Sequence, residues 1–232
     1  MSGFAELDYA PTPLGPLTLR RRPEPRLGRD VLEVLLRDEH LMSDAFTASE
    51  VALADAVLAR LPDRPLQVVV GGLGLGYTAR AALADRRVRS CRVVEYLEPV
   101  LRWHVDGLVP LGAELHADPR FNVVQADFFA LATDGFGTPG ERFDAVLIDI
   151  DHAPDRLLGR DAGFYGEEGF ARLSAQLTPG GACGLWCDDA PDDAITDALA
   201  AAFGAAEAVP VVWANPYTAG TVTQTVYVGV VP

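Results

Sequence analysis

The stretch at residues 66–76 constrains the fold more than any other part of the chain. A β-branched run ends in Val70-Gly71-Gly72-Leu73-Gly74-Leu75-Gly76, and an alanine-rich segment with a helical pattern follows. A second apolar run ends at Glu95, 19 residues after Gly76. Glycines let the backbone turn sharply and approach a ligand, and an acid at the tip of the second strand can accept hydrogen bonds from two ribose hydroxyls. We therefore predict the first βαβ unit of a nucleotide-binding sheet, with Gly72, Gly74, Gly76 and Glu95 as binding residues.

The glycines alone also have a simpler explanation, because tight strand–helix turns use glycine for steric reasons. Glu95 at the end of the second strand favours nucleoside binding over that explanation. The spacing does not choose between a dinucleotide and S-adenosylmethionine as the ligand.

The composition is that of an ordinary globular protein. The 232 residues are 49% hydrophobic and 22% charged, which suits one large domain with or without a small appendage. No apolar stretch reaches the roughly 20 residues of a membrane span, and the N-terminus lacks the pattern of a signal peptide. Three cysteines are too few for a disulfide framework, and Cys183 and Cys187 are expected to be buried free thiols. We expect a cytoplasmic protein.

The net charge of −14 disfavours nucleic acid and anionic membranes as partners. One dense basic cluster runs through Arg20-Arg21-Arg22, Arg26 and Arg29, and we interpret it as the solvated end of a hairpin. An acidic protein suits a cationic ligand. A small-molecule acceptor is the expected partner, and a homodimer is compatible with the sequence.

The first 46 residues are predicted to form a small β element ahead of the main domain. Residues 7–9 and 17–20 flank a Pro/Gly-rich turn, as in a β-hairpin, and residues 31–36 can add another strand. Thr47-Ala48-Ser49-Glu50 has the spacing of a capping box and opens an apolar-periodic helix at 51–61. We expect two units, residues 1–46 and residues 47–232.

From residue 66 onward, predicted strands and helices alternate. Two late β-rich runs, 209–213 and 223–228, have no helix between them and are expected to pair antiparallel at one edge. Five parallel strands with helical crossovers and a terminal antiparallel pair predict an α/β fold, the class I methyltransferase (Rossmann-like) doubly wound sheet. The parallel strands are placed at 66–70, 91–94, 121–125, 143–150 and 181–187, and the helices at about 76–85, 97–108, 164–177 and 191–203.

Acidic residues follow the predicted strands at the edge where such sheets bind ligands. After Glu95 come Asp127, Asp149 and the pair Asp188-Asp189. Asp127 is well placed to accept from an adenine amino group, with Phe128 against the ring, and Asp149 then faces the reacting end of the ligand. Simpler roles stay open, because Asp127 could cap the next helix, Phe128 could be core, and Asp188-Asp189 could cap the helix that begins near Pro191.

The chain from about residue 5 onward resembles the spermidine synthase family, the polyamine aminopropyltransferases, and especially its shorter bacterial relatives. The resemblance implies a small N-terminal β domain before a class I sheet. It also implies that Glu95 takes the ribose, that Asp127 takes the adenine, and that Asp149 receives the proton of the attacking amine. The matching segments are residues 70–76, 93–95, 118–127, 143–149, 164–170 and 177–181.

Three departures from that family concern the reacting end of the site. The family's first turn carries an acid that holds the amino ends of donor and acceptor, and Gly74 stands in its place. The acids after the fourth strand are arranged differently, as Asp149-Ile150-Asp151-His152. The family's Tyr-Gln pair has no counterpart near Glu50.

The missing acid at Gly74 favours intact S-adenosylmethionine, because a second acid repels its carboxylate while helix N-terminal amides bind it. We therefore expect transfer of a methyl or 3-amino-3-carboxypropyl group to an amine or hydroxyl, with Asp149, Asp151 and His152 as candidate catalytic residues. The main alternative is an aminopropyltransferase that uses decarboxylated S-adenosylmethionine. A metal-dependent O-methyltransferase with ligands from residues 149–151 and 188–189, and a catalytically idle nucleoside-binding regulator, are further alternatives.

Overall fold

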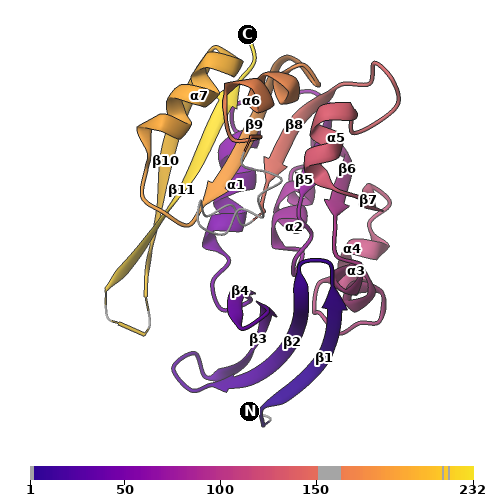
Figure 1. The fold of residues 1–232 in the computed structure, drawn as a ribbon, viewed down its shortest axis with the longest axis vertical. Helices are drawn as coiled ribbons and strands as arrows, with labels where there is room; N and C mark the ends of the chain where they lie inside the picture. Colours follow the sequence, from indigo (N-terminus) through magenta and orange to yellow (C-terminus); the bar gives the residue numbers. More distant parts are fainter. Residues whose placement is uncertain (1–2, 151–162, 216, 219) are drawn as a thin grey trace.

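The computed structural model describes residues 3–150, 163–215, 217–218 and 220–232. It contains two sheets (Figure 1). The smaller one is antiparallel, in the order β1-β2-β3-β4, and its strands are β1 (Ala5–Thr12), β2 (Gly15–Glu24), β3 (Arg29–Leu36) and β4 (Glu39–Ser43). The hairpin and the third strand confirm the prediction for this region. β4 was not predicted, because its five residues begin with the polar Glu39-His40 and offer little alternation.

The larger sheet has the order β10-β11-β9-β8-β5-β6-β7. The five strands from β9 to β7 in that order are parallel, and β11 and β10 pair antiparallel at the edge. This arrangement confirms the predicted class I methyltransferase-like fold. The elements of this part are α1 (Ala48–Leu58), β5 (Leu66–Gly71), α2 (Tyr77–Ala84), β6 (Val88–Glu95), α3 (Glu98–Val105), α4 (Gly112–Ala117), β7 (Phe121–Gln125), α5 (Phe128–Asp134), β8 (Phe143–Ile148), α6 (Glu167–Ser174), β9 (Leu177–Cys187), α7 (Asp193–Phe203), β10 (Ala205–Ala214) and β11 (Thr221–Val230).

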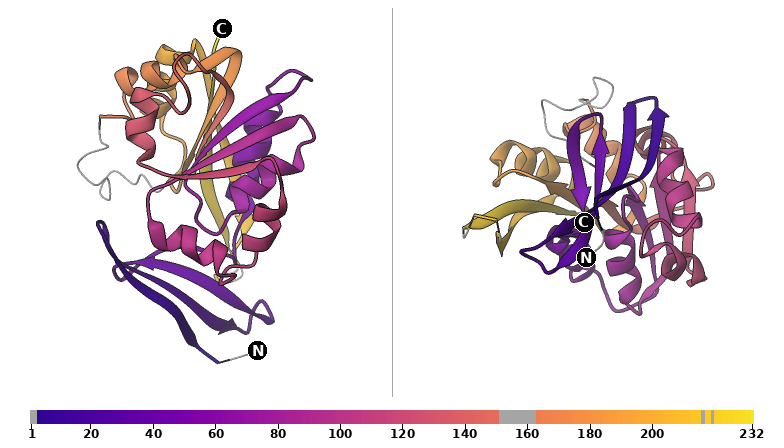
Figure 2. Two further views of the ribbon diagram at one scale, coloured as in Figure 1. Left: turned by 90° about the vertical axis from the view of Figure 1, so that its right-hand side faces the viewer. Right: turned by 90° about the horizontal axis from the view of Figure 1, so that it is seen from below.

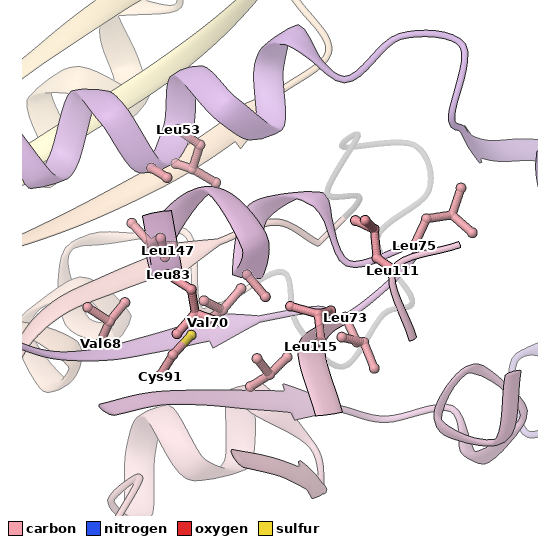
Figure 3. Close-up of a cluster of buried hydrophobic side chains, with 14 of the residues drawn as sticks. Leu53, Val68, Val70, Leu73, Leu75, Leu83, Cys91, Leu111, Leu115 and Leu147 are labelled. Atoms are coloured by element: carbon pink, nitrogen blue, oxygen red, sulfur yellow. The ribbon is translucent and has the colours of Figure 1, made fainter. Parts of the chain in front are cut away.

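The central strands are buried on both faces, which explains why they read as continuous apolar runs. Successive residues alternate between faces, so Val68 and Val70 pack with α1 and α2, while Val69 packs on the opposite side with α5, α6 and α7. Figure 3 shows Val68 and Val70 with Leu53 of α1 and Leu83 of α2 in the first of these clusters. Burial of each such side chain contributes about 2 kcal/mol to the stability of the fold. The packing on both faces therefore fixes the positions of the strand ends.

The small sheet lies across the end of the large sheet at which β6 and β8 point (Figures 1 and 2). Two polar contacts join Asp8 to α3, since its Oδ2 accepts from Trp103 Nε1 at 2.6 Å and from Arg102 Nη2 at 2.7 Å. Leu17 and Leu19 of β2 are fully buried in the same cluster as Val68. The carboxyl edge of the large sheet is therefore covered by a second layer. The division after residue 46 stays a prediction.

The basic cluster on the small sheet fits its interpretation as a solvated hairpin end only in part: Arg26 and Arg29 are exposed at the turn between β2 and β3, whereas Arg20 and Arg22 are half-buried. Arg20 and Arg22 both bond the buried Glu33, at 2.7 Å each, and Arg22 also bonds Glu24. Arg26 donates to the Tyr217 carbonyl oxygen at 2.6 Å, which links the small sheet to the loop between β10 and β11. These arginines are partners of acids and carbonyls on the protein itself. In the part of the chain that is described, no helix is long and apolar enough to cross a membrane.

Candidate active site

The glycine-rich turn joins β5 to α2 at the covered edge of the large sheet. Its three predicted binding glycines all have positive φ, 90° at Gly72, 47° at Gly74 and 95° at Gly76. A Cβ at Gly72 would lie 2.3 Å from the Asp149 carbonyl oxygen, so the turn passes directly against the end of β8. At Gly74 a Cβ would lie 2.5 Å from Met42 Sδ of β4. The glycines thus have steric reasons within the protein, in addition to the predicted approach of a ligand.

Glu95 ends β6 beside this turn, as the sequence predicted. The residue is 7% exposed, and its two carboxylate oxygens accept from backbone amides, Leu73 N at 2.9 Å and Leu97 N at 2.7 Å. Burial raises the pKa of Glu95, and these amide bonds oppose the rise. The backbone amides of Gly74 and Tyr96 also stabilise the ionised form, so four amides in all face the carboxylate. Glu95 therefore fixes the turn, and its role at a ribose stays a prediction.

At the end of β7, the simpler roles describe what the structure contains. Asp127 Oδ1 accepts from Phe129 N at 2.9 Å and Ala130 N at 3.3 Å, which makes Asp127 the N-cap of α5. Phe128 is only 3% exposed and belongs to the core, where a Cβ on Gly71 would lie 2.6 Å from its ring. Asp127 Oδ2 is the atom left for an adenine amino group, whereas the Phe128 ring has almost no free face to offer one.

Asp149 lies where β8 meets the turn. Its backbone N–H donates to Gly71 O at 2.9 Å, and its Oδ2 accepts from Thr78 Oγ1 at 2.5 Å. Burial raises the pKa of Asp149 to about 6, and the Thr78 hydroxyl opposes that rise. Thr78 stands in the first turn of α2, so the hydrogen bond fixes the carboxyl group beside the glycine-rich turn. A carboxyl with this pKa can take and return a proton near neutral pH.

Glu50 is a site residue that the sequence analysis did not find. It stands in the first turn of α1, is 8% exposed, and accepts from Ser49 Oγ at 2.8 Å. Burial, and then the negative charge of Asp149, raise its pKa to about 7. The predicted capping box is wrong, because the Thr47 side chain caps no amide in the described part of the chain. In the sequence, the Thr47–Glu50 spacing assigned Glu50 to a helix cap. No local pattern links Glu50 with Asp149, which lies 99 residues away.

The acids after β9 do not cap the next helix, which corrects one of the simpler roles considered above. Asp192 is the cap, since its Oδ1 accepts from Ala194 N at 2.8 Å. Asp188 Oδ1 instead accepts from Gln224 Nε2 of β11, and the Asp189 carbonyl oxygen accepts from Thr225 Oγ1 at 2.7 Å. Residues 3–150 and the described residues after 162 contain no group of three or more metal-ligating side chains. Asp151 and His152 lie outside the described residues.

Comparison with known proteins places the fold. No protein-family model matches the chain, and no curated protein matches its sequence. The solved spermidine synthase from Thermotoga maritima has a TM-score of 0.73 at 15% identity, with 97% of this chain and 72% of that chain covered. A spermidine synthase in complex with the transition-state analogue AdoDATO gives 0.73 at 16% identity over the same shares. A probable spermidine synthase from Corynebacterium glutamicum ATCC 13032 gives 0.64 at 15%, with 97% and 79% covered. The predicted spermidine synthase-like fold is confirmed.

Proposed function

We propose that the chain is a spermidine synthase-like transferase that passes the aminopropyl group of decarboxylated S-adenosylmethionine to an amine. The observation that carries the proposal is the pair of carboxyl groups on Glu50 and Asp149. They come from α1 and the end of β8, next to the glycine-rich turn; burial raises the pKa of both, and the negative charge of Asp149 raises that of Glu50 further. A cation between two such groups lowers the free energy of both ionised forms. The site therefore suits an ammonium group.

The Glu50–Asp149 pair favours a different donor from the one expected from the sequence. The preference for intact S-adenosylmethionine rested on the missing carboxylate at Gly74. Glu50 brings a buried carboxylate to the same edge from a different element. A donor that ends in an ammonium fits such a site, while a donor that adds its own carboxylate meets repulsion there. The fold shared with spermidine synthases, one of them in complex with AdoDATO, adds support for this class of donor.

Roles for the remaining residues follow from their positions. Gly72, Gly74 and Gly76 form the wall against the donor, with Glu95 at the ribose and Asp127 Oδ2 at the adenine amino group. The donor supplies an electrophilic carbon beside its sulfonium. Asp149 orients the acceptor nitrogen and takes its proton as the new C–N bond replaces the C–S bond, and Glu50 holds positive charge near it. Residues 1–46 then cover the acceptor site, and Met42 of β4, which lies next to Gly74, is part of that cover.

Transfer of a methyl or 3-amino-3-carboxypropyl group from intact S-adenosylmethionine is the second candidate. Gly74 favours it, because a methionine thioether, and no acid from the turn, covers that position. Both candidates share the nucleoside half of the site and differ in what lies at the amino-acid end of the donor.

A product assay separates these candidates. The protein is incubated with each donor and a series of small diamines, and the nucleoside product is identified. We expect methylthioadenosine from the decarboxylated donor, strongly reduced in Asp149→Asn and Glu50→Gln, and unchanged in the control Glu98→Gln, an exposed acid of α3. S-adenosylhomocysteine as the product would replace this proposal with methyl transfer. Tight binding of either donor without any product would favour the nucleoside-binding regulator.

A further inference from the structure

We propose that His104 of α3 is a positioning residue that fixes the glycine-rich turn for donor binding. Its Nε2 lies 2.9 Å from the carbonyl oxygen of Gly74, 30 residues earlier in the chain. The residue is 2% exposed, and it is separate from the acidic residues at the edge of the sheet. The inference rests on the proposed function for its consequence, donor affinity, but its structural part stands on this contact.

The hydrogen-bond partners determine which ring nitrogen carries the proton. A carbonyl oxygen can only accept, so the hydrogen lies on Nε2. Nδ1 is then a bare acceptor, and it is buried without a hydrogen-bond partner among the described residues. Burial lowers the pKa of His104, which keeps the ring neutral. A ring that leaves one nitrogen unpaired in the interior is held there by its packing and by the single bond that its other nitrogen makes.

Glycines on two sides let the neighbouring backbone approach His104, one at its ring and one at its main chain. A Cβ at Gly76 would lie 3.1 Å from His104 Cε1, and a Cβ at Gly112 of α4 would lie 2.3 Å from the His104 carbonyl oxygen. Leu111 and Leu115, on either side of Gly112, belong to the same buried cluster as Leu73 and Leu75 of the turn (Figure 3). His104 is therefore enclosed between the turn and α4, and a side chain at either glycine would displace it.

The bond to Gly74 orients the peptide that follows it. In a trans peptide, the carbonyl and the next N–H point in opposite directions. With the Gly74 oxygen held toward His104, the Leu75 N–H points away from α3 and α4. Release of that carbonyl lets the peptide rotate at a glycine with φ of 47°, where rotation meets little steric resistance. The turn would then lose its fixed arrangement of amides at the amino-acid end of the donor.

The test compares His104→Leu, which removes the donor, with His104→Gln, whose amide nitrogen can replace Nε2. Hydrogen–deuterium exchange of peptides that cover residues 71–77 is measured on the free protein, with β8 as the internal reference. We expect about tenfold faster exchange in the leucine variant, as for the loss of one buried hydrogen bond, and near-wild-type exchange in the glutamine variant. Equal exchange in all three proteins overturns the proposal.

Donor binding provides the functional measurement. His104→Leu should weaken the affinity for S-adenosylmethionine or its decarboxylated form about tenfold, with turnover at saturating donor nearly unchanged. Methylthioadenosine, which lacks the amino-acid end, should lose less affinity. A fall in turnover with unchanged affinity would contradict the positioning role. If wild type binds none of these nucleosides, the proposed function fails, while the exchange comparison still decides the role of His104.

If His104→Leu does not fold, ¹⁵N NMR of wild type tests the same geometry. The Nε2–H tautomer at neutral pH is expected, and an Nδ1–H tautomer would overturn the proposal.

Discussion

The proposed site has a nucleoside half and an acceptor half, and the acidic residues of the two halves differ in their hydrogen-bond partners. In the nucleoside half, Glu95 is buried but bonded to two backbone amides, and Asp127 is bonded to the first amides of α5. In the acceptor half, Glu50 and Asp149 each accept a bond from one hydroxyl, and burial raises the pKa of both. The acids of the nucleoside half are thus bonded by backbone amides, although burial still raises the pKa of Glu95. The acids of the acceptor half have fewer donors, and a proton or a cation relieves their charge.

From this difference we infer that the two halves have separate functions. Under the proposed function, a wall stabilised by its own backbone should bind a nucleoside without rearrangement, since the Glu95 carboxylate is already oriented by backbone amides. A pair of acids with raised pKa values stores unfavourable free energy that a cationic ligand relieves on binding. Changes in the first half should therefore alter donor affinity, and changes in the second should alter turnover and pH dependence.

The largest effect is expected from Asp149→Asn. The substitution keeps the shape and the contact to Thr78 but removes the charge and the basicity. Turnover should fall roughly 100-fold or more, as for the loss of a general base, while donor affinity stays nearly constant. Steady-state kinetics with the active diamine, together with calorimetric titration of the donor, measure both quantities. Near-wild-type turnover would make Asp149 structural and remove chemistry from the acceptor half.

The corresponding change in the nucleoside half is Glu95→Ala. It removes the predicted ribose contact, and donor affinity should weaken at least tenfold, about 1.4 kcal/mol. Calorimetry measures this on protein whose melting temperature has been checked, because Glu95 also holds Leu73 and Leu97. Glu98→Ala, an exposed acid three residues later, is the matched control. Unchanged affinity in folded Glu95→Ala would exclude Glu95 from the nucleoside site.

Stability against pH gives an intermediate effect. Glu50 has a folded pKa of about 7, above the unfolded value of about 4.3, so the folded state binds the proton more tightly. Stability is then greatest at low pH and falls as the pH rises from about 4 through 7. Glu50→Gln removes this loss. The difference in unfolding free energy, Glu50→Gln minus wild type, should therefore be roughly 1–3 kcal/mol larger at pH 8 than at pH 4.

Denaturant unfolding at several pH values measures that difference. Asp149→Asn should give a similar gain, and the double variant should gain less than the sum, because removing either charge relieves the other. Parallel pH profiles for wild type and Glu50→Gln would show that the pKa of Glu50 is not raised in the folded state, and fully additive gains in the double variant would show that the two acids do not interact.

The two halves also differ in how far the sequence predicts them. The turn, α2 and β6 are consecutive, so their apolar periodicity and glycine spacing predict the strand-end position of Glu95. The Glu50–Asp149 pair arises when α1 packs on β8 and β9, and no window of sequence contains both residues. Phe128 shows the same limit, since its place under Gly71 depends on the packing of α5. Apolar periodicity predicts individual helices and strands, whereas contacts between elements distant in the sequence depend on tertiary packing.

The smallest effect, and the sharpest test of the boundary between the halves, is expected at Gly74. Its φ of 47° lies in the left-handed region, which aspartate and asparagine tolerate better than most residues. The obstacle to a side chain is Met42 Sδ, the flexible end of a side chain that can move. Gly74→Asp and Gly74→Asn share that strain and differ only in charge. The ratio of affinities for decarboxylated and intact S-adenosylmethionine, measured by calorimetry, should therefore be a few-fold higher in the aspartate variant, since one added charge near solvent contributes about 1 kcal/mol. Equal ratios would mean that the turn does not face the amino-acid end of the donor, and that the acids of the acceptor half alone set the choice of donor.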